Sequence, residues 1–187
     1  MSRLRARRRP DLAGLNVDAR LFLQQIPLFG DVLGPDQLAT LAAASRPAFF
    51  RSGTLLMSQG DLGGSMFAVV DGTVSVNFKD GNGREQTLAT LGPGEIVGEM
   101  SLFTGDRRTA TVSALTSVNA LEITKASLEK MFARSPDLLD KFSAVLAGRQ
   151  AELNAIARQT GGVATEEFAM RARKFFMQVF GRSNPRG

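Results

Sequence analysis

The stretch GEIVGEMSLFTGDRRTATVSA, residues 94–114, places charged side chains directly beside an apolar, strand-like segment. It carries a glutamate, Glu99, and two adjacent arginines, Arg107 and Arg108, and an alternating segment at 109–114 follows immediately. Charged side chains are costly to bury unless they are paired or bind a partner. Their position beside a predicted core strand therefore calls for a chemical explanation.

The residues around Glu99 and Arg108 have the chemistry of a site for a small nucleotide. Gly98 has no Cβ and lets the backbone approach a ligand closely, and residues 99–103 favour a single helical turn whose first N–H groups attract anions. Arg108 is expected to direct its guanidinium at that turn, because arginine pairs bidentately with phosphate and keeps its proton. Glu99 would repel an anion, so its expected partners are neutral hydroxyls such as those of a ribose.

The sequence around this stretch is β-rich between residues 47 and 124. Short runs that alternate apolar and polar residues are separated by turn signals such as Asp71-Gly72 and Gly92-Pro93-Gly94. Many short strands at close spacing favour an α+β fold, namely an antiparallel β-roll of double-stranded jelly-roll type flanked by N-terminal and C-terminal helices.

The pattern divides the chain into segments. They are a basic arm at 1–17 that is expected to be disordered, N-terminal helices at 18–46, the β-roll at 47–124, C-terminal hinge or lid helices at 125–158, and a basic amphipathic tail at 159–187. Among the N-terminal helices, the spacing predicts Leu21, Phe22 and Ile26 on the inner face of the first, then a loop containing Pro27 and Gly30, then a helix that begins at Pro35.

The composition excludes several classes of chemistry. Cysteine and histidine are absent from the 187 residues, which excludes disulfides, thiol catalysis, zinc sites built from these residues and any triad with an imidazole base. We therefore expect no enzymatic activity, no catalytic residue, no metal site and no cofactor beyond a bound ligand. No run approaches the roughly 18 consecutive apolar residues of a membrane span, and the absence of cysteine fits a cytoplasmic location.

The positive charge is concentrated at the two ends of the chain. Residues 1–10 contain five arginines, and residues 171–187 contain five further basic residues; neither segment has an acidic residue. These ten positive charges exceed the net charge of +5, so residues 11–170 carry a net charge of −5. A nucleic-acid reader more usually carries its basic stripe on the folded body, so no nucleic-acid partner is expected.

The stretch resembles the phosphate-binding cassette of the cyclic nucleotide-binding domain family, the β-roll type of catabolite activators and of protein kinase A regulatory subunits. The family pattern is Gly-Glu-x-(Ala/Gly/Ser)-Leu, a short spacer, and Arg-(Ala/Ser/Thr)-Ala-(Thr/Ser)-Val. This sequence supplies Gly98-Glu99-Met100-Ser101-Leu102 and Arg108-Thr109-Ala110-Thr111-Val112 at that separation, a cassette at 98–112. The resemblance spans roughly residues 29–158.

The resemblance implies cAMP or cGMP as the ligand. It assigns the ribose 2′-hydroxyl to Glu99 and the cyclic phosphate to Arg108, with backbone N–H groups near Ser101 and Thr109 completing the phosphate cradle. The ligand-binding residues implied in this way are Gly98, Glu99, Met100, Ser101, Arg108, Thr109 and Ala110. No metal or catalytic role is implied for any of them.

Two positions leave alternatives open. Many family members have proline just before the cassette arginine, where this chain has Arg107; the extra charge either attracts the ligand at long range or points to solvent. A threonine at the position of Thr109 contacts the guanine amino group in some members and accompanies cAMP responses in bacterial-looking domains. We rank cAMP before cGMP.

Three functions fit the family. The first is a sensor module that transmits nucleotide binding through its C-terminal helices to an effector protein, with self-association through those helices as a further option. The second is the regulatory domain of a bacterial channel or transporter whose membrane part is not in this chain. The third, a transcription regulator, ranks last because the 29 residues after Arg158 are too few for a winged DNA-binding domain. Phe142, Val145 and Leu146, on the predicted long helix, belong either to the core or to a lid over the purine.

Overall fold

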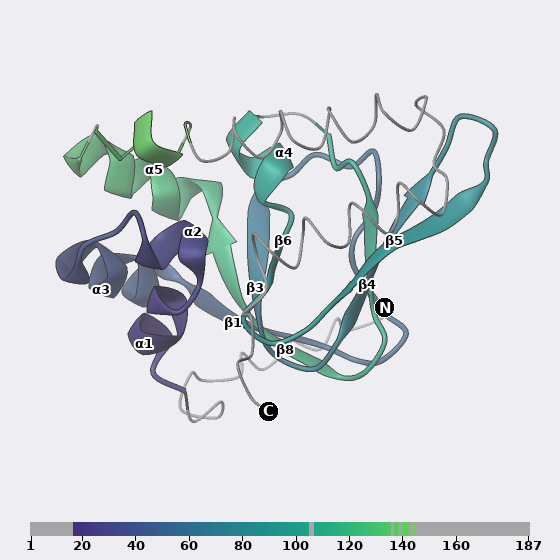
Figure 1. Cartoon of the computed structure of the whole chain (residues 1–187), viewed down its shortest axis with the longest axis horizontal. Helices are drawn as coiled ribbons and strands as arrows, with labels where there is room; N and C mark the ends of the chain where they lie inside the picture. The colour runs from purple at the N-terminus through teal and green to yellow at the C-terminus, as the bar shows by residue number, and fades with distance from the viewer. Residues whose placement is uncertain (1–16, 105–106, 136, 139, 143, 145–187) are drawn as a thin grey trace, which may run out of the picture.

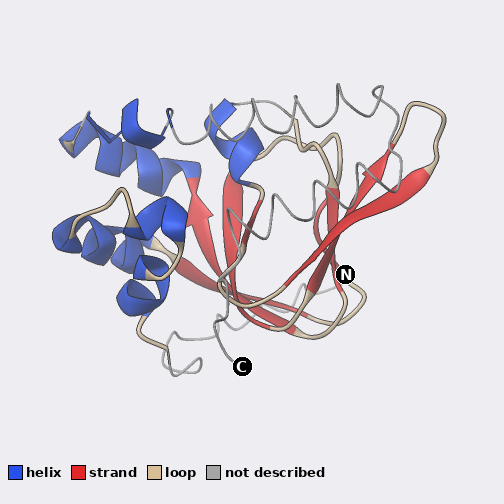
Figure 2. Cartoon of the chain, viewed as in Figure 1, coloured by secondary structure: helices blue, strands red, loops and turns tan. Residues whose placement is uncertain are grey.

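The computed structural model describes residues 17–104, 107–135, 137–138, 140–142 and 144. Two four-stranded antiparallel sheets form the centre of the molecule, and α1, α2, α3 and α5 gather at one side of them (Figure 1 and Figure 2). This is the α+β β-roll with flanking helices that the sequence predicts. The predicted basic arm, most of the long C-terminal helix and the amphipathic tail lie outside the described residues.

The strands fall into two sheets. The first has the order β1 (Arg46–Phe50), β8 (Val118–Thr124), β3 (Ser65–Asp71) and β6 (Ile96–Val97). The second has the order β2 (Leu55–Met57), β7 (Thr111–Ala114), β4 (Val74–Lys79) and β5 (Glu85–Leu91). The helices are α1 (Ala19–Gln24), α2 (Pro27–Gly30), α3 (Pro35–Ala44), α4 (Glu99–Thr104) and α5 (Lys125–Arg134).

The central strands of the first sheet, β8 and β3, bury side chains on both faces of the sheet. Along β3, Met66 and Ala68 pack among the helices, whereas Phe67 and Val69 pack between the sheets, as the two-residue side-chain period of a strand requires. The neighbouring strand β8 repeats the division, because Ile123 lies opposite Met66 in the register. The core therefore has two halves, one on each side of this sheet.

The N-terminal helices depart from the predicted pattern at two places. Leu21, predicted to face inward, is 46% exposed, and Leu23 is fully buried in its stead, together with Ile26. The segment predicted as a loop around Pro27 is the short helix α2, which has its proline in the first turn. A Cβ on Gly30 would overlap the carbonyl oxygen of Gln24, so α2 packs this closely on α1 only with glycine at that position.

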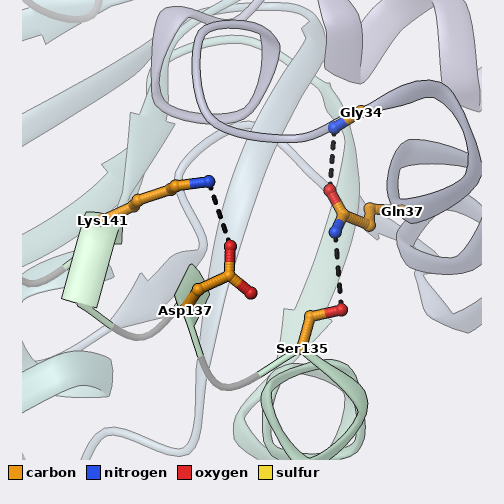
Figure 3. Close-up of polar contacts among 5 residues, drawn as sticks. All are labelled: Gly34, Gln37, Ser135, Asp137 and Lys141. Carbon is orange, nitrogen blue, oxygen red and sulfur yellow. Dashed lines mark hydrogen bonds and ion pairs between the residues drawn. The ribbon is translucent and has the colours of Figure 1, made fainter.

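The end of α5 is connected to the start of α3 by a side-chain amide (Figure 3). Gln37 accepts a hydrogen bond from the N–H of Gly34 at 2.8 Å and donates one to the hydroxyl of Ser135 at 3.5 Å. Just beyond Ser135, Lys141 and Asp137 form an exposed ion pair at 3.0 Å. The hydrogen bond between Gln37 and Ser135 places the end of α5 beside the start of α3.

Phe142 lies in the helical half of the core. Its side chain has no exposed surface, and its ring centroid is 6.3 Å from that of Phe29 and 5.6 Å from that of Phe132. Of the two alternatives for Phe142, the structure described here has the core position. Val145 and Leu146 lie outside the described residues.

Candidate functional site

The cassette begins where β6 ends, at a backbone position that only glycine fits well. Gly98 has a φ of +84°, in the left-handed region that side chains disfavour. A Cβ there would also lie 2.5 Å from Nη1 of Arg108 and 2.8 Å from Cε of Met57. Gly98 therefore lets the guanidinium of Arg108 approach the backbone that leads into α4.

The guanidinium of Arg108 is buried and held by three acceptors. Its Nη1 donates to the carbonyl of Gly98 and to the hydroxyl of Ser101, both at 2.8 Å, and its Nη2 donates to the carbonyl of Ser65. Only 7% of this residue is exposed. An arginine has five N–H donors, so Nε and one N–H of Nη2 have no partner among the described residues.

The main chain of Arg108 is fixed as well. Its N–H donates to the carbonyl of Asp61 at 2.7 Å, and its carbonyl accepts from the N–H of Gly60 at 2.8 Å. The preceding Arg107 is exposed and forms an isolated antiparallel bridge with Leu62. Its Nη1 donates to the carbonyl of Gly60 at 2.7 Å, so Arg107 lies on the outside and fastens the same loop.

Glu99 and Arg108 are buried side chains of opposite charge, and the charge of Glu99 acts on the guanidinium of Arg108. Glu99 is 3% exposed and begins α4, and among the described residues these two are the charged side chains that are buried. Burial lowers the pKa of Arg108, and the negative charges of Glu99 and Asp61 oppose that shift. Because arginine titrates so far above neutrality, the guanidinium stays protonated, and a desolvated cation with spare donors attracts an anion.

The other predicted site residues lie at different depths. Ser101 is 3% exposed and accepts from Arg108, so its hydroxyl joins the site directly. Met100 is half-buried in α4, and Ala110 is half-buried against the core between the sheets. The side chain of Thr109 is exposed. The structure thus brings Gly98, Glu99, Ser101 and Arg108 together, with Thr109 at the edge.

Sequence reasoning missed the loop on the other side of Arg108. Ser65 accepts from the guanidinium, and the backbone of Gly60 and Asp61 fixes the main chain. The turn at Gly60-Asp61 is visible in the sequence, but nothing there indicates that it faces the cassette. The glycine pair Gly63-Gly64 was a signal of the same kind, since adjacent glycines often mark close backbone packing.

Two features are absent from the part of the chain that the structure describes. Within it, no group of three or more histidine, cysteine, aspartate or glutamate side chains is placed to hold a metal ion. No helix in that part is both long and apolar enough to cross a membrane.

Comparison with known proteins agrees with this geometry. The profile of the family described as "Cyclic nucleotide-binding domain" matches residues 47–135. A CRP-like cAMP-activated global transcriptional regulator of Mycobacterium tuberculosis is 28% identical over 120 residues, which cover 64% of this chain and 54% of the relative. A cyclic nucleotide-gated potassium channel of Mesorhizobium japonicum is 36% identical over 117 residues, covering 63% of this chain and 31% of the channel.

A solved structure extends the likeness to the whole domain. The N-terminal domain of a transcriptional regulator from Streptomyces coelicolor A3(2) is 33% identical, with a TM-score of 0.62, and the match covers 72% of this chain and 95% of that one. The chain spans about half the length of the mycobacterial regulator and about a third of the channel. These relatives are regulators and a channel rather than enzymes. By fold, cassette and sequence, the chain belongs to the cyclic nucleotide-binding domain family.

Proposed function

We propose that this chain is a cAMP-sensing regulatory module, with cGMP as the second-ranked ligand. The observation that carries the proposal is the buried guanidinium of Arg108, which keeps two N–H donors without a partner among the described residues. A desolvated, protonated arginine with spare donors matches the single negative charge and the two exocyclic oxygens of a cyclic phosphate.

The neighbouring carboxylate supports a ribose rather than a second phosphate. Glu99 is buried at the start of α4, beside the guanidinium. A buried carboxylate repels phosphate but accepts hydrogen bonds from hydroxyls, and such charge-assisted bonds are stronger than neutral ones. We assign the ribose 2′-hydroxyl to Glu99 and the cyclic phosphate to Arg108, with Gly98, Met100, Ser101, Thr109 and Ala110 completing the contact surface.

The description of a relative supports cAMP rather than cGMP as the first-ranked ligand. The mycobacterial relative is described as cAMP-activated, and the Thr109 hydroxyl, which would contact a guanine, belongs to an exposed side chain at the edge of the site. A threonine at the edge still allows either base, so cGMP remains the competitor in the test below.

Transmission requires a connection from the site to the C-terminal helices. The loop that holds Arg108 supplies one, because the carbonyl of Gly64 accepts from the N–H of Lys125, the first residue of α5, at 2.9 Å. We propose that nucleotide binding shifts α5 and the helix after it through this loop. Moving a two-state switch from 1:99 to 99:1 needs about 5.5 kcal/mol of differential affinity, within the roughly 8 kcal/mol of micromolar binding.

The recipient of the signal is a second proposal. An effector protein in the cytoplasm, contacted by the C-terminal helices, is our first choice, and self-association through those helices is compatible with it. The regulatory domain of a channel is the alternative, favoured by the 36% identity to a cyclic nucleotide-gated potassium channel. A transcription regulator ranks third, on the strength of the CRP-like relative.

Calorimetric titration of the purified chain with cAMP and cGMP tests the binding proposal. The wild type should bind cAMP more tightly than cGMP, and Arg108→Ala should weaken cAMP binding by about a hundredfold or more, since a charge-assisted, bidentate contact is lost. Absence of cAMP and cGMP binding by the wild type, or retained affinity in Arg108→Ala, would contradict the proposal.

Arg107→Ala is the matched control. It removes the same side chain and the same charge one residue earlier, but from an exposed position outside the buried contacts of the Arg108 guanidinium. We expect its affinity for cAMP to fall by less than about threefold at physiological salt, because exposed charges are screened over about 8 Å. Equal losses for the two arginines would mean that net charge, rather than the buried contact, governs binding.

A further inference from the structure

Two adjacent glycines in the loop beside Arg108 face different surroundings. A Cβ added to Gly63 would overlap the hydroxyl oxygen of Ser101, and would lie 2.8 Å from Cβ of Ser101 and 3.1 Å from Cζ of Arg108. A Cβ added to Gly64 would have no atom within 4 Å. Neither glycine has a positive φ, so the backbone itself accepts alanine at both positions.

The neighbours of Gly63 have little freedom to move away. Arg108 is held by the carbonyls of Gly98 and Ser65 and by the Ser101 hydroxyl, and its main chain is bonded to the 60–61 turn. Ser101 is buried in α4. Separations below 3.0 Å from a real Cβ essentially never occur, and the 2.8 Å neighbour is a Cβ attached to the helix backbone. Any side chain at 63 must therefore displace α4, the loop or the guanidinium.

We propose that Gly63 is a positioning residue for the guanidinium of Arg108 in the proposed phosphate site. The empty space at its Cβ position lets the Ser101 hydroxyl and the Arg108 guanidinium meet beneath the loop, which leaves the two remaining N–H groups of Arg108 available to a cyclic phosphate. The inference rests on the proposed function, because it concerns the same ligand. It adds that affinity at this site depends on a residue that contributes no side-chain atom.

Cyclic AMP titrations of three proteins test this inference by calorimetry: the wild type, Gly63→Ala and Gly64→Ala. Gly63→Ala should weaken cAMP binding by about tenfold or more, equivalent to about 1.4 kcal/mol. Gly64→Ala, the same substitution one residue away in open space, should stay within about threefold of the wild type. Cooperative thermal unfolding of both variants shows that the fold is intact.

A second substitution separates positioning from general damage. Ser101→Gly removes the two atoms that a Cβ at residue 63 would meet most closely. In that background Gly63→Ala should weaken binding by less than about threefold, so the two substitutions should be strongly non-additive. If Gly63→Ala alone fails to fold, the same comparison is made between Ser101→Gly and the double variant, which lacks the clash.

Side-chain NMR of Arg108 gives a readout that needs no nucleotide. The Nε–H resonance of Arg108, assigned by its loss in Arg108→Lys, should move in Gly63→Ala and keep its position in Gly64→Ala. An unmoved resonance, an affinity within threefold of the wild type, or equal losses for the two glycine variants would overturn the inference. Wild-type protein that binds neither cAMP nor cGMP would contradict the proposed function instead, and the resonance would still decide whether Gly63 positions the guanidinium.

Discussion

The two faces of the first sheet bury different kinds of side chain. On the helical face, a buried apolar cluster runs from Leu23 and Phe29 to Phe142. The opposite face closes on the second sheet with apolar residues too, and Met57 of that cluster and the guanidinium of Arg108 both lie beside Gly98. The apolar cluster between the sheets therefore borders the buried charge of the cassette.

The difference shows which burial serves stability and which serves binding. Apolar burial stabilises the fold by roughly 25 cal/mol per Å², whereas taking charged side chains out of water costs free energy. The helical face should therefore determine how firmly the domain folds, and the cassette should determine what it binds.

The largest expected effect is on the helical face. Phe142→Ala should lower the free energy of unfolding by about 3–5 kcal/mol, the usual range for removing a buried phenylalanine, because its ring is fully buried between Phe29 and Phe132. Urea denaturation measures the change. Phe49→Ala is the matched control, since Phe49 is 48% exposed, and it should lose less than about 1 kcal/mol. Similar losses for both variants would contradict the described packing.

An intermediate effect is expected at the carboxylate of the cassette. If Glu99 accepts from the ribose, the wild type should prefer cAMP over 2′-deoxy-cAMP by about tenfold, the value of one hydrogen bond to a charged group. Glu99→Gln should reduce that preference to about threefold or less. Calorimetry with both nucleotides on both proteins gives the ratio. A preference that is unchanged in Glu99→Gln would remove Glu99 from the sugar site, even if total affinity fell.

The smallest effect concerns Glu95, in the turn before the cassette. Burial raises the pKa of Glu95 above its ordinary 4.5, although the N–H of Gly92 donates to the carboxylate and lowers it. The folded state therefore holds this proton more tightly than the unfolded chain, so this contribution to stability is lost as pH rises from about 4.5 through the folded pKa.

Glu95→Gln removes this titration and keeps an oxygen that can accept from Gly92. Its stability near pH 7 should equal or exceed that of the wild type by less than about 1 kcal/mol, since the carboxylate is only half-buried and water screens it. The advantage should disappear below pH 4.5. Thermal unfolding at several pH values measures it; an advantage that grows as the pH falls would have the wrong sign.

The sequence predicts the cassette better than it predicts the helices. The residues from Gly98 to Arg108 predict both the helical turn of α4 and the direction of the Arg108 guanidinium, because the two features lie within one short segment of the chain. The face of α1 was harder, since its apolar residues run together and Leu23 and Ile26, not Leu21, meet the core. Which face is buried depends on the packing of α3 and the sheet, which no local pattern contains.

The missed part of the site has a different cause. Ser65 contributes a backbone carbonyl and Gly63 contributes empty space, and neither depends on a side-chain type that a motif would record. Proximity of the 60–65 loop to Arg108 is a long-range contact, visible only once β3 and β7 are placed. The assignments of individual ligand contacts stay predictions until nucleotide is titrated.

The fixed main chain of Arg108 has a kinetic consequence. Hydrogen bonds to Gly60 and Asp61 hold its peptide group, and three acceptors hold its guanidinium, before any nucleotide is present. The conformational entropy of this long side chain is therefore lost during folding rather than at the moment of encounter. The arginine side chain then needs no rearrangement to bind the phosphate, so diffusion should govern the association rate. Differences in affinity between nucleotides should therefore lie mainly in their dissociation rates.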